Sequence, residues 1–434
     1  MKKLTSFLLT LLLVVAAFGA CAESDKPYAG ETITYWMQKY GTSPDTQIKA
    51  LDQLTADFYE KTGIKVEYSL VDWGQAHTKY TLAMTGGECP DVADTFFAYS
   101  WVAIGGEERG PMNINDVVEE LGGEDKFFGF AKPECYVNGH WVGLPWRGDT
   151  RISCYNSDMF AEAGIESFPT TLDELLMAAQ KLTTYDAKGN VDRAGFLFRQ
   201  SGPALAQTFR ALLAGMGGSV MNEDYTEFTI DTPEVRETLQ FMQDCLYKYK
   251  VMPTTILDPT FTADDAYAAG KAAIVFGAVP DYLETLKNNA PQIADVTVGA
   301  VSPSKTGEGA SSIAFAAPVV IFNATEHEGA AKEWLKYLFQ TENQLTLSEG
   351  CGTVSVWDDV LKQDRFSSQW YQTVLQQNSR AVPGDMPVTV WSQVDASPNG
   401  PLNTMVMDVM AGNDIDTAIA TCVAAIDEIV ASAE

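Results

Sequence analysis

TITYWM at residues 32–37 and IKVEYSL at residues 64–70 are the stretches that decide the fold. In both, side chains alternate with a period of two, which is typical of β-strands. The intervening residues 45–61 carry apolar side chains at helical spacing, and Gly63 then ends the helix. A strand, a helix and a second strand predict an α/β layer with a largely parallel sheet.

The same alternation of strands and helices continues along the chain. A further strand is predicted from Pro90, and the pattern resumes after Gly143. Helix starts are marked by a threonine before the first turn. These predicted starts are Thr171, Thr232, Thr262 and Thr325. The 434 residues exceed one compact core and no polar linker divides them, so we expect two α/β domains joined by short strand crossings.

The amino-terminal segment has the form of a secretion signal. A basic start precedes an apolar run at residues 4–18, which is shorter than the roughly twenty residues that span a bilayer. Cys21 after two small residues predicts a bacterial lipoprotein, with residues 1–20 removed as a signal peptide, Cys21 acylated and residues 21–30 acting as a tether. The alternative is ordinary cleavage after Ala22. Either form works outside the cytoplasm, on the outer face of the cytoplasmic membrane or in the periplasm.

The charge of the chain argues against one class of partner. A net charge of -29 and a pI near 4.4 provide no basic stripe to replace counterions, so we expect no nucleic-acid binding. The three histidines lack metal-ligand spacing, and the sequence has no nucleophile elbow, Walker loop or dinucleotide fingerprint. We therefore expect no metal, no cofactor and no enzyme activity. The six scattered cysteines besides Cys21 are expected to be buried free thiols, with disulfides as the alternative.

Aromatic residues next to charged residues are the sequence feature that indicates a class of ligand. Nine Trp and seventeen Tyr are present, and residues 146–151 read WRGDTR. Sugar rings stack on aromatic rings, while carboxylates and guanidinium groups bind sugar hydroxyls. This pattern favours a carbohydrate-binding protein, and it also suits a secreted carbohydrate-cleaving enzyme. A binding protein for a non-sugar solute, such as a polyamine or a peptide, is the third alternative.

Eight segments occur in an order that is typical of one protein family. They are residues 33–36, 58–66, 87–92, 136–145, 154–165, 168–175, 269–273 and 330–338. In this order the chain resembles the extracellular solute-binding proteins of ABC transporters, the sugar-binding type related to maltose-binding protein. The resemblance covers nearly the whole mature chain.

This resemblance implies an α/β fold of two lobes, each a mostly parallel sheet flanked by helices, with a ligand cleft at the hinge. It implies a first lobe of residues 31–149 and 302–351 and a second lobe of residues 150–301 and 352–434. The implied function is capture of a carbohydrate, an oligosaccharide, and its delivery to the permease subunits of an ABC importer. The protein is expected to be a monomer that meets the membrane through its lipid anchor only.

The resemblance also assigns residues to the cleft. It implies that Asp149 accepts hydrogen bonds from sugar hydroxyls and that Trp36 and Trp391 stack on sugar rings. The full implied set of ligand-binding residues is Trp36, Gln38, Lys39, Tyr40, Asp94, Thr95, Trp146, Arg147, Asp149, Arg151 and Trp391. At residues 277–279 the chain has Gly-Ala-Val where the family often has Gly-Pro-Trp, so one stacking platform is expected to be missing.

Overall fold

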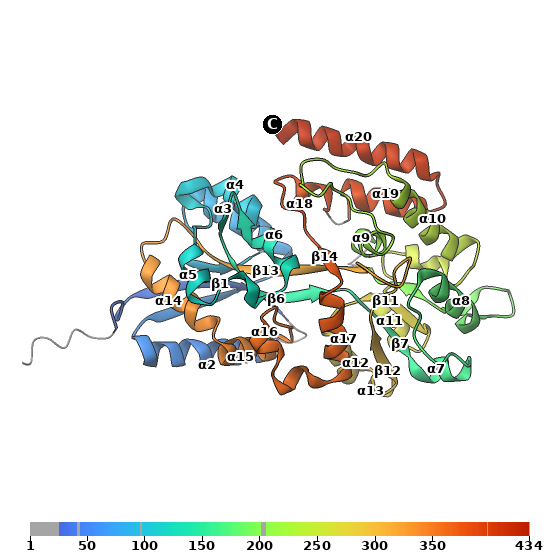
Figure 1. Cartoon of the computed structure of the whole chain (residues 1–434), viewed down its shortest axis with the longest axis horizontal. Coiled ribbons are helices and arrows are strands. Elements are labelled where there is room, and N and C mark those ends of the chain that lie inside the picture. Colours follow the sequence, from blue (N-terminus) through green and yellow to red (C-terminus); the bar gives the residue numbers. More distant parts are fainter. Residues whose placement is uncertain (1–25, 41–43, 96–97, 201–204, 397, 434) are drawn as a thin grey trace, which may run out of the picture.

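Two β-sheets form the centres of two lobes that lie side by side (Figure 1). The computed structural model describes residues 26–40, 44–95, 98–200, 205–396 and 398–433, so the predicted signal peptide and Cys21 lie outside the described residues. The strands of the first sheet are β1 (Thr32–Gln38), β2 (Lys65–Val71), β3 (Val92–Asp94), β6 (Leu144–Thr150), β13 (Ser312–Ile321) and β14 (Ala381–Pro383). Those of the second sheet are β7 (Ile152–Asn156), β10 (Leu197–Phe198), β11 (Ile274–Ala278) and β12 (Thr297–Ala300).

The first sheet has the parallel core that the sequence predicts. β1 lies between β2 and β3 and is parallel to both. Ile33, Tyr35 and Met37 of β1 are completely buried, whereas Thr34 and Trp36 on its other face are half-buried. β13, buried along its whole length, continues the sheet antiparallel to β3 and β6. The polar end of β1 thereby lies beside β3, and β13 and β6 continue the same sheet.

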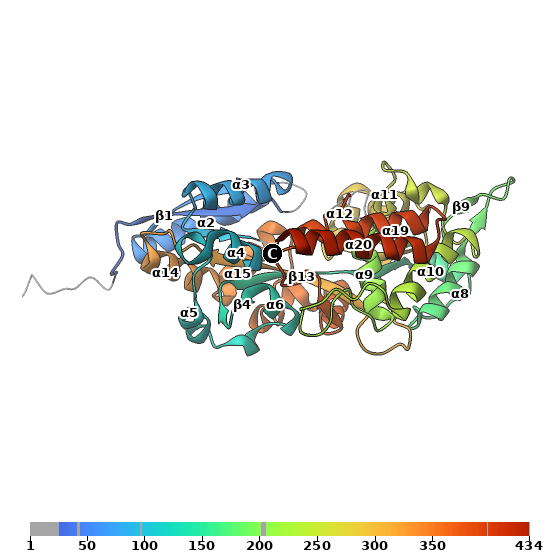
Figure 2. The same cartoon turned by 90° about the horizontal axis from the view of Figure 1, so that it is seen from above.

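Helices cover both faces of the first sheet (Figures 1 and 2). The longest, α2, packs Leu51, Leu54 and Phe58 toward β1 and ends at Gly63, whose φ of +76° favours glycine. The helices of this lobe are α2 (Pro44–Thr62), α3 (Trp73–Gly86), α4 (Ala98–Arg109), α5 (Asn115–Glu120), α6 (Lys132–Cys135), α14 (Glu328–Leu338), α15 (Thr341–Cys351) and α16 (Asp358–Leu361). Short strands β4 (Tyr136–Val137) and β5 (His140–Trp141) form a hairpin beside them.

The second lobe is richer in helix than the first. Its helices are α7 (Ser157–Glu162), α8 (Leu172–Leu182), α9 (Ala206–Gly215), α10 (Pro233–Tyr247), α11 (Ala263–Ala268), α12 (Tyr282–Asn289), α13 (Pro291–Ala294), α17 (Gln369–Asn378), α18 (Trp391–Val394), α19 (Pro401–Met410) and α20 (Ile415–Ala433). A hairpin of β8 (Thr184–Tyr185) and β9 (Val191–Arg193) projects from it. Within the described residues, no helix combines the length and apolarity that a membrane crossing requires.

Three of the four predicted helix starts are confirmed. Thr171 forms a complete capping box with Glu174, and the hydroxyls of Thr232 and Thr262 also cap their helices. The prediction at Thr325 was wrong. Its hydroxyl donates to Asp91 at 2.5 Å instead, and α14 begins at Glu328 without a side-chain cap.

The second sheet departs from the mostly parallel arrangement that was predicted. Only β10 and β11 pair in parallel, while β7 runs antiparallel to both β11 and β12. The reason is the hinge connectivity. β7 enters this lobe directly from β6 of the other sheet and is inserted between β11 and β12, which run the opposite way.

The chain crosses between the lobes in three places before α17, and β14 later returns to pair with β13 of the first sheet. Arg151 alone separates β6 from β7. After β12 the chain stays beside the second lobe, where Ser304 donates its backbone N–H to Thr170, and it joins the first sheet at Ser312. The third passage follows Leu361, since Asp359 still pairs with Lys126 of the first lobe. We therefore propose lobe boundaries near residues 150, 311 and 365, with β14 rejoining the first sheet, whereas the sequence predicted 149/150, 301/302 and 351/352.

The six cysteines among the described residues are free thiols, as expected. Cys135, Cys154, Cys245, Cys351 and Cys422 are buried, and Cys89 is half-buried. Burial raises the pKa of the Cys422 thiol to about 12, so that side chain acts as a small apolar residue.

Candidate functional site

Two neighbouring cavities lie between the lobes, one on each side of the end of β6. The first cavity, of about 330 Å³, includes Lys39 and Tyr40 from the first lobe and Asp281 from the second. The second cavity, of about 380 Å³, includes Gln38 and Thr95 from the first lobe and Gln207, Asp385 and Asp395 from the other side. Trp73, Arg147 and Asp149 line both. The two cavities are therefore adjacent parts of one cleft between the lobes.

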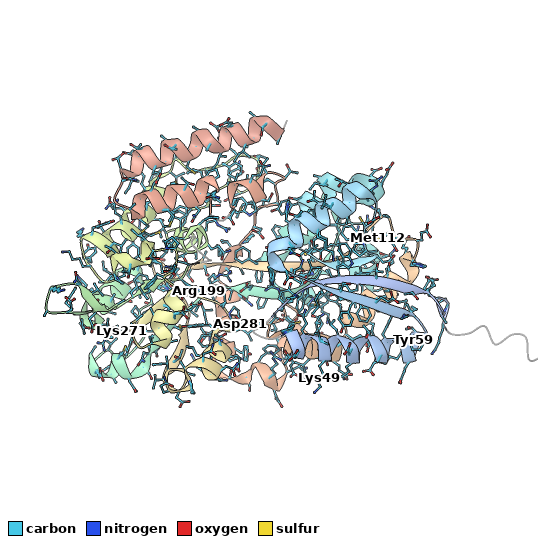
Figure 3. All side chains as sticks on the ribbon, turned by 180° about the vertical axis from the view of Figure 1, so that it is seen from behind. Lys49, Tyr59, Met112, Arg199, Lys271 and Asp281 are labelled. Atoms are coloured by element: carbon cyan, nitrogen blue, oxygen red, sulfur yellow. The ribbon has the colours of Figure 1, made fainter. Side chains whose placement is uncertain are left out.

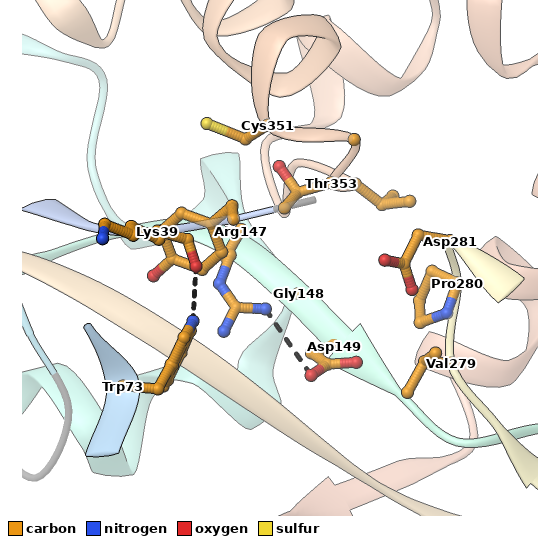
Figure 4. A pocket seen from close by; sticks show the side chains of 13 residues that line it. Lys39, Trp73, Arg147, Gly148, Asp149, Val279, Pro280, Asp281, Cys351 and Thr353 are labelled. Carbon is orange, nitrogen blue, oxygen red and sulfur yellow. Dashed lines mark hydrogen bonds and ion pairs between the residues drawn. The ribbon is translucent and has the colours of Figure 1, made fainter. Parts of the chain in front are cut away.

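A carboxylate held between two guanidinium groups lies at the centre of this cleft. Oδ1 of Asp149 accepts a hydrogen bond from Nη1 of Arg151 at 2.6 Å, and its Oδ2 lies 3.6 Å from Nη1 of Arg147. Burial alone would raise the pKa of Asp149, but the charges of Arg151 and Arg147 hold it below its ordinary value. Asp149 is thus an ionised hydrogen-bond acceptor, and Figure 4 shows it facing Asp281 across the first cavity.

An aromatic group stands beside this carboxylate. The Trp73 side chain is 46% exposed, and its indole N–H donates to the carbonyl of Lys39 at 2.5 Å. Tyr40 meets Trp73 edge to face at 5.3 Å, and the Arg147 guanidinium lies 4.7 Å from the centre of the Tyr40 ring. Trp73 therefore offers a fixed aromatic surface at the junction of the two cavities.

Asp94 supports this arrangement from behind. It is completely buried and accepts hydrogen bonds from the Tyr40 hydroxyl at 2.5 Å and the Trp146 indole at 2.8 Å. Burial raises the pKa of Asp94 to about 6, although these hydrogen bonds and Arg147 act in the opposite direction. Neither Asp94 nor Trp146 lines the two cavities, so both position the residues that do.

The structure brings seven of the eleven predicted binding residues to the wall of the cleft. They are Gln38, Lys39, Tyr40, Thr95, Arg147, Asp149 and Arg151. Arg151 links the lobes, because its Nη2 donates to Gln207 of α9 at 2.8 Å. These seven lie at the ends of β1, β3 and β6, where the resemblance implied a cleft.

The two predicted stacking platforms lie elsewhere. Trp391 is completely buried, with its indole donating to Asp385 at 2.8 Å and the Arg210 guanidinium 4.9 Å from its ring. It supports the cleft wall and presents no face to it in this conformation. Trp36 packs against Tyr80, and the Lys79 ammonium lies 3.8 Å from the centre of its ring. Its place on the face of β1 under α3 keeps it away from both cavities.

Several residues of the cleft were missed from the sequence. Trp73 had a usable signal, since an aromatic residue next to Gly74 follows the end of a predicted strand. The others belong to no motif, because segments distant in sequence bring them together. They are His77, Gln207, Asp281, Phe315, Thr353, Asp385 and Asp395. Figure 3 shows Asp281 on the side of its lobe that faces the other lobe.

Comparisons with known proteins agree on one family. A family model described as bacterial extracellular solute-binding protein matches residues 42–345. The chain is 28% identical over 170 residues to the diacetylchitobiose-binding protein DasA of Streptomyces coelicolor, with 38% of each chain covered. It is 24% identical over 282 residues to an arabinooligosaccharide-binding protein of Halalkalibacterium halodurans, with 63% of this chain and 60% of the relative covered.

A third relative points to another solute. It is a Sinorhizobium fredii protein named a probable amino-acid ABC transporter periplasmic-binding protein, 27% identical over 223 residues, with 49% of this chain and 48% of the relative covered. The matches to these three relatives thus span between 38% and 60% of the relatives' lengths.

A solved structure confirms the fold. The sugar-binding protein MalE of Xanthomonas citri superposes with a TM-score of 0.78 at 20% identity, covering 92% of this chain and 98% of that one. At this identity the likeness concerns the fold alone. It confirms the two-lobed α/β architecture that the sequence predicted.

Proposed function

The chain belongs to the family of bacterial extracellular solute-binding proteins, and on that premise we propose that it captures a carbohydrate of more than one ring between its lobes and delivers it to an ABC importer. The observation that carries the proposal is the junction of the two cavities at Trp73, Arg147 and Asp149. A half-exposed indole beside an ionised carboxylate and a guanidinium suits the apolar face and polar rim of a sugar ring. Two adjacent cavities suit a ligand with two linked rings.

Binding would work through closure of the lobes. A solute that contacts both lobes favours the state in which the lobes are close together, by its difference in affinity for the two states. Shifting a population from 1:99 to 99:1 needs about 5.5 kcal/mol, which lies within the roughly 8 kcal/mol of a micromolar ligand. Gln207 and Asp281 on one side and Gln38 and Trp73 on the other are the groups that such a solute would connect.

Delivery would depend on the location of the protein. We propose that Cys21 is acylated and that the tether holds a monomeric protein at the outer face of the cytoplasmic membrane, near its permease. A tether raises the effective concentration of one partner at the other. The family match supports an extracellular place of action, and the sequence pattern at Cys21 supports the anchor.

Two alternative functions can be distinguished from this proposal by experiment. The amino-acid relative favours a non-sugar solute in the same cleft. A carbohydrate-cleaving activity has one observation in its favour, because burial and the charge of Asp149 raise the pKa of Asp281 while that of Asp149 is lowered. A glycosidase needs such a divided pair of carboxyl groups. The family membership favours binding without catalysis.

The test is a thermal-shift screen of the mature protein against oligosaccharides, monosaccharides and amino acids, since a ligand of the folded state raises its stability. We expect the largest shift with an oligosaccharide, which chromatography should recover intact. A shift with amino acids alone would refute the carbohydrate proposal. Cleaved products that disappear in Asp281→Asn would establish the enzyme instead.

A further inference from the structure

Two carboxyl groups, those of Asp385 and Asp395, line one end of the second cavity. Buried Glu134 lies near Asp385 but does not line the cavity, and burial together with the charge of Asp385 raises the pKa of Glu134 well above the ordinary value, so it adds no negative charge. Arg210, whose side chain is 2% exposed, pairs with Asp395 at 2.8 Å. At the opposite end Asp149 lies between Arg147 and Arg151, so positive charge exceeds negative charge there. When Asp385 and Asp395 are both ionised, they carry one more negative charge than Arg210 compensates at this end of the cavity.

One carboxylate oxygen at this end of the cavity has no hydrogen-bond donor among the described residues. Oδ2 of Asp395 accepts from Arg210, whereas its Oδ1 has no hydrogen-bond partner among the described residues. Burial raises the pKa of Asp395 to about 7 despite Arg210, and burial likewise raises the pKa of Asp385. Both shifts indicate that a further positive charge would be stabilised here.

An independent acceptor lies on the opposite wall. Gln38 is completely buried and lines the same cavity, its Nε2 donates to Tyr80, and its Oε1 accepts no hydrogen bond from any described residue. A buried acceptor without a donor destabilises the protein, so an occupant that donates a hydrogen bond to it is favoured. Both lobes thus present unused acceptors to the cavity, and the occupant that suits them is rich in N–H or O–H donors.

The remaining walls limit the shape of the occupant. Trp73, Trp101 and Phe315 line the cavity, so a ring with apolar faces fits better than a flexible chain. A metal ion is a poor alternative, because no group of three or more His, Cys, Asp or Glu side chains in the described part of the chain is arranged to hold one.

We propose that the second cavity takes a sugar ring carrying a basic amino group, with its ammonium paired to Asp385 and Asp395 and its ring against the aromatic wall. This inference rests on the proposed carbohydrate function and names the class of sugar. An N-acetylated or hydroxylated ring of the same shape would fit the walls but leave the excess charge uncompensated. A polyamine would supply the charge without filling the aromatic wall.

The experiment compares three disaccharides that differ only at carbon 2 of each ring. They are the β-1,4 disaccharide of glucosamine, its di-N-acetylated form and cellobiose, with spermidine as a fourth probe. Calorimetry at slightly acidic pH should give the amine disaccharide a dissociation constant lower than the others by about tenfold or more. Its binding should also release protons, seen as a heat that depends on the buffer, because the ammonium favours ionised Asp395.

Variants test whether the carboxyl groups at this end of the cavity, and not the net charge of the protein, select the amine. Asp395→Asn and Asp385→Asn should each reduce the preference for the amine, measured as the ratio of the cellobiose and amine dissociation constants, to about threefold or less. Asp192→Asn removes the same charge at an exposed pair with Lys271, outside the cleft, and should keep the full preference. Should both cleft variants fail to fold, the proton release by the unmodified protein still tests the pairing.

The following results would each overturn the inference. Equal affinity for the three disaccharides, or no binding of the amine form at millimolar concentration, removes the amino-sugar assignment. Spermidine binding as tightly as the amine disaccharide would assign the acidic end to a polyamine. If neutral oligosaccharides bind without preference, the proposed function survives and only this inference fails. If no carbohydrate binds at all, both fail.

Discussion

Arg151 donates a 2.6 Å hydrogen bond from Nη1 to Oδ1 of Asp149, and the two residues flank the point where the chain leaves the first sheet for the second. Nη2 of the same guanidinium binds Gln207 of the second lobe. The acceptor proposed for sugar hydroxyls is therefore fixed at the hinge itself. A ligand that pulls on Asp149 acts directly on the crossing between the lobes.

Replacing Asp149 by Asn should weaken both binding and stability. Loss of a charged acceptor should lower affinity by about 1.5–3 kcal/mol. Stability should also fall, since Arg147 and Arg151 are 7% exposed and lose their shared counter-charge. Removing one partner of a buried pair costs about 3–5 kcal/mol, and the amide should keep the cost toward the low end. Calorimetry and denaturant melts measure the two effects, and undiminished affinity would exclude Asp149 from the site.

Trp73→Ala and Trp391→Ala should have opposite effects. Trp73 is half-exposed, so its loss should reduce sugar affinity by about 1–3 kcal/mol and change the free energy of unfolding little. Trp391 is completely buried, and its loss should cost about 3–5 kcal/mol of stability. The same melts and titrations serve both variants. The reverse result would restore Trp391 as the platform and make Trp73 a structural residue.

The fold was predictable because its signals are local. The alternation in β1, the spacing in α2 and the capping box at Thr171 each depend on residues near in sequence. Thr325 was misassigned because Asp91, distant in sequence, captures its hydroxyl. The direction of β7 likewise depends on where the chain crosses between sheets, which no local pattern encodes.

The sequence predicted residues of the cleft wall only where they lie at the end of a strand. Gln38, Thr95 and Asp149 follow or end strands, and that position places them in the cleft. Trp391 and Asp395 sit on or beside a short helix whose position is set by contacts with Arg210 and Asp385. The sequence around an aromatic residue in such a segment is the same whether the residue is exposed or buried, so sequence alone could not predict that Trp391 is buried in this structure.

The pH dependence of stability should carry the signature of Asp395. Burial raises its pKa to about 7 in the folded state, against about 3.9 for an ordinary Asp. The folded state then binds the proton more tightly, so the free energy of unfolding should fall as pH rises from about 4 to about 7 and then level off. The change should be on the order of a few kcal/mol. Denaturant melts of Asp395→Asn across this range should give a flatter profile, and an unchanged slope would assign the proton to another group.

Cys21→Ala should release the protein from the membrane. If the thiol is acylated, the unmodified protein fractionates with membranes and the variant becomes soluble, with no change in ligand affinity. Fractionation of cells followed by immunoblotting measures this. A soluble unmodified protein whose mature terminus is Glu23 would establish cleavage after Ala22 instead.

Small-angle X-ray scattering during a titration with the oligosaccharide found by the screen tests the central claim most directly. We predict that the radius of gyration decreases on binding and that the decrease saturates at the concentration at which calorimetry shows the cleft to be full. Asp149→Asn should shift that saturation to higher concentration by the factor by which its affinity falls. Tight binding of the sugar with no change in the radius of gyration would contradict capture between closing lobes.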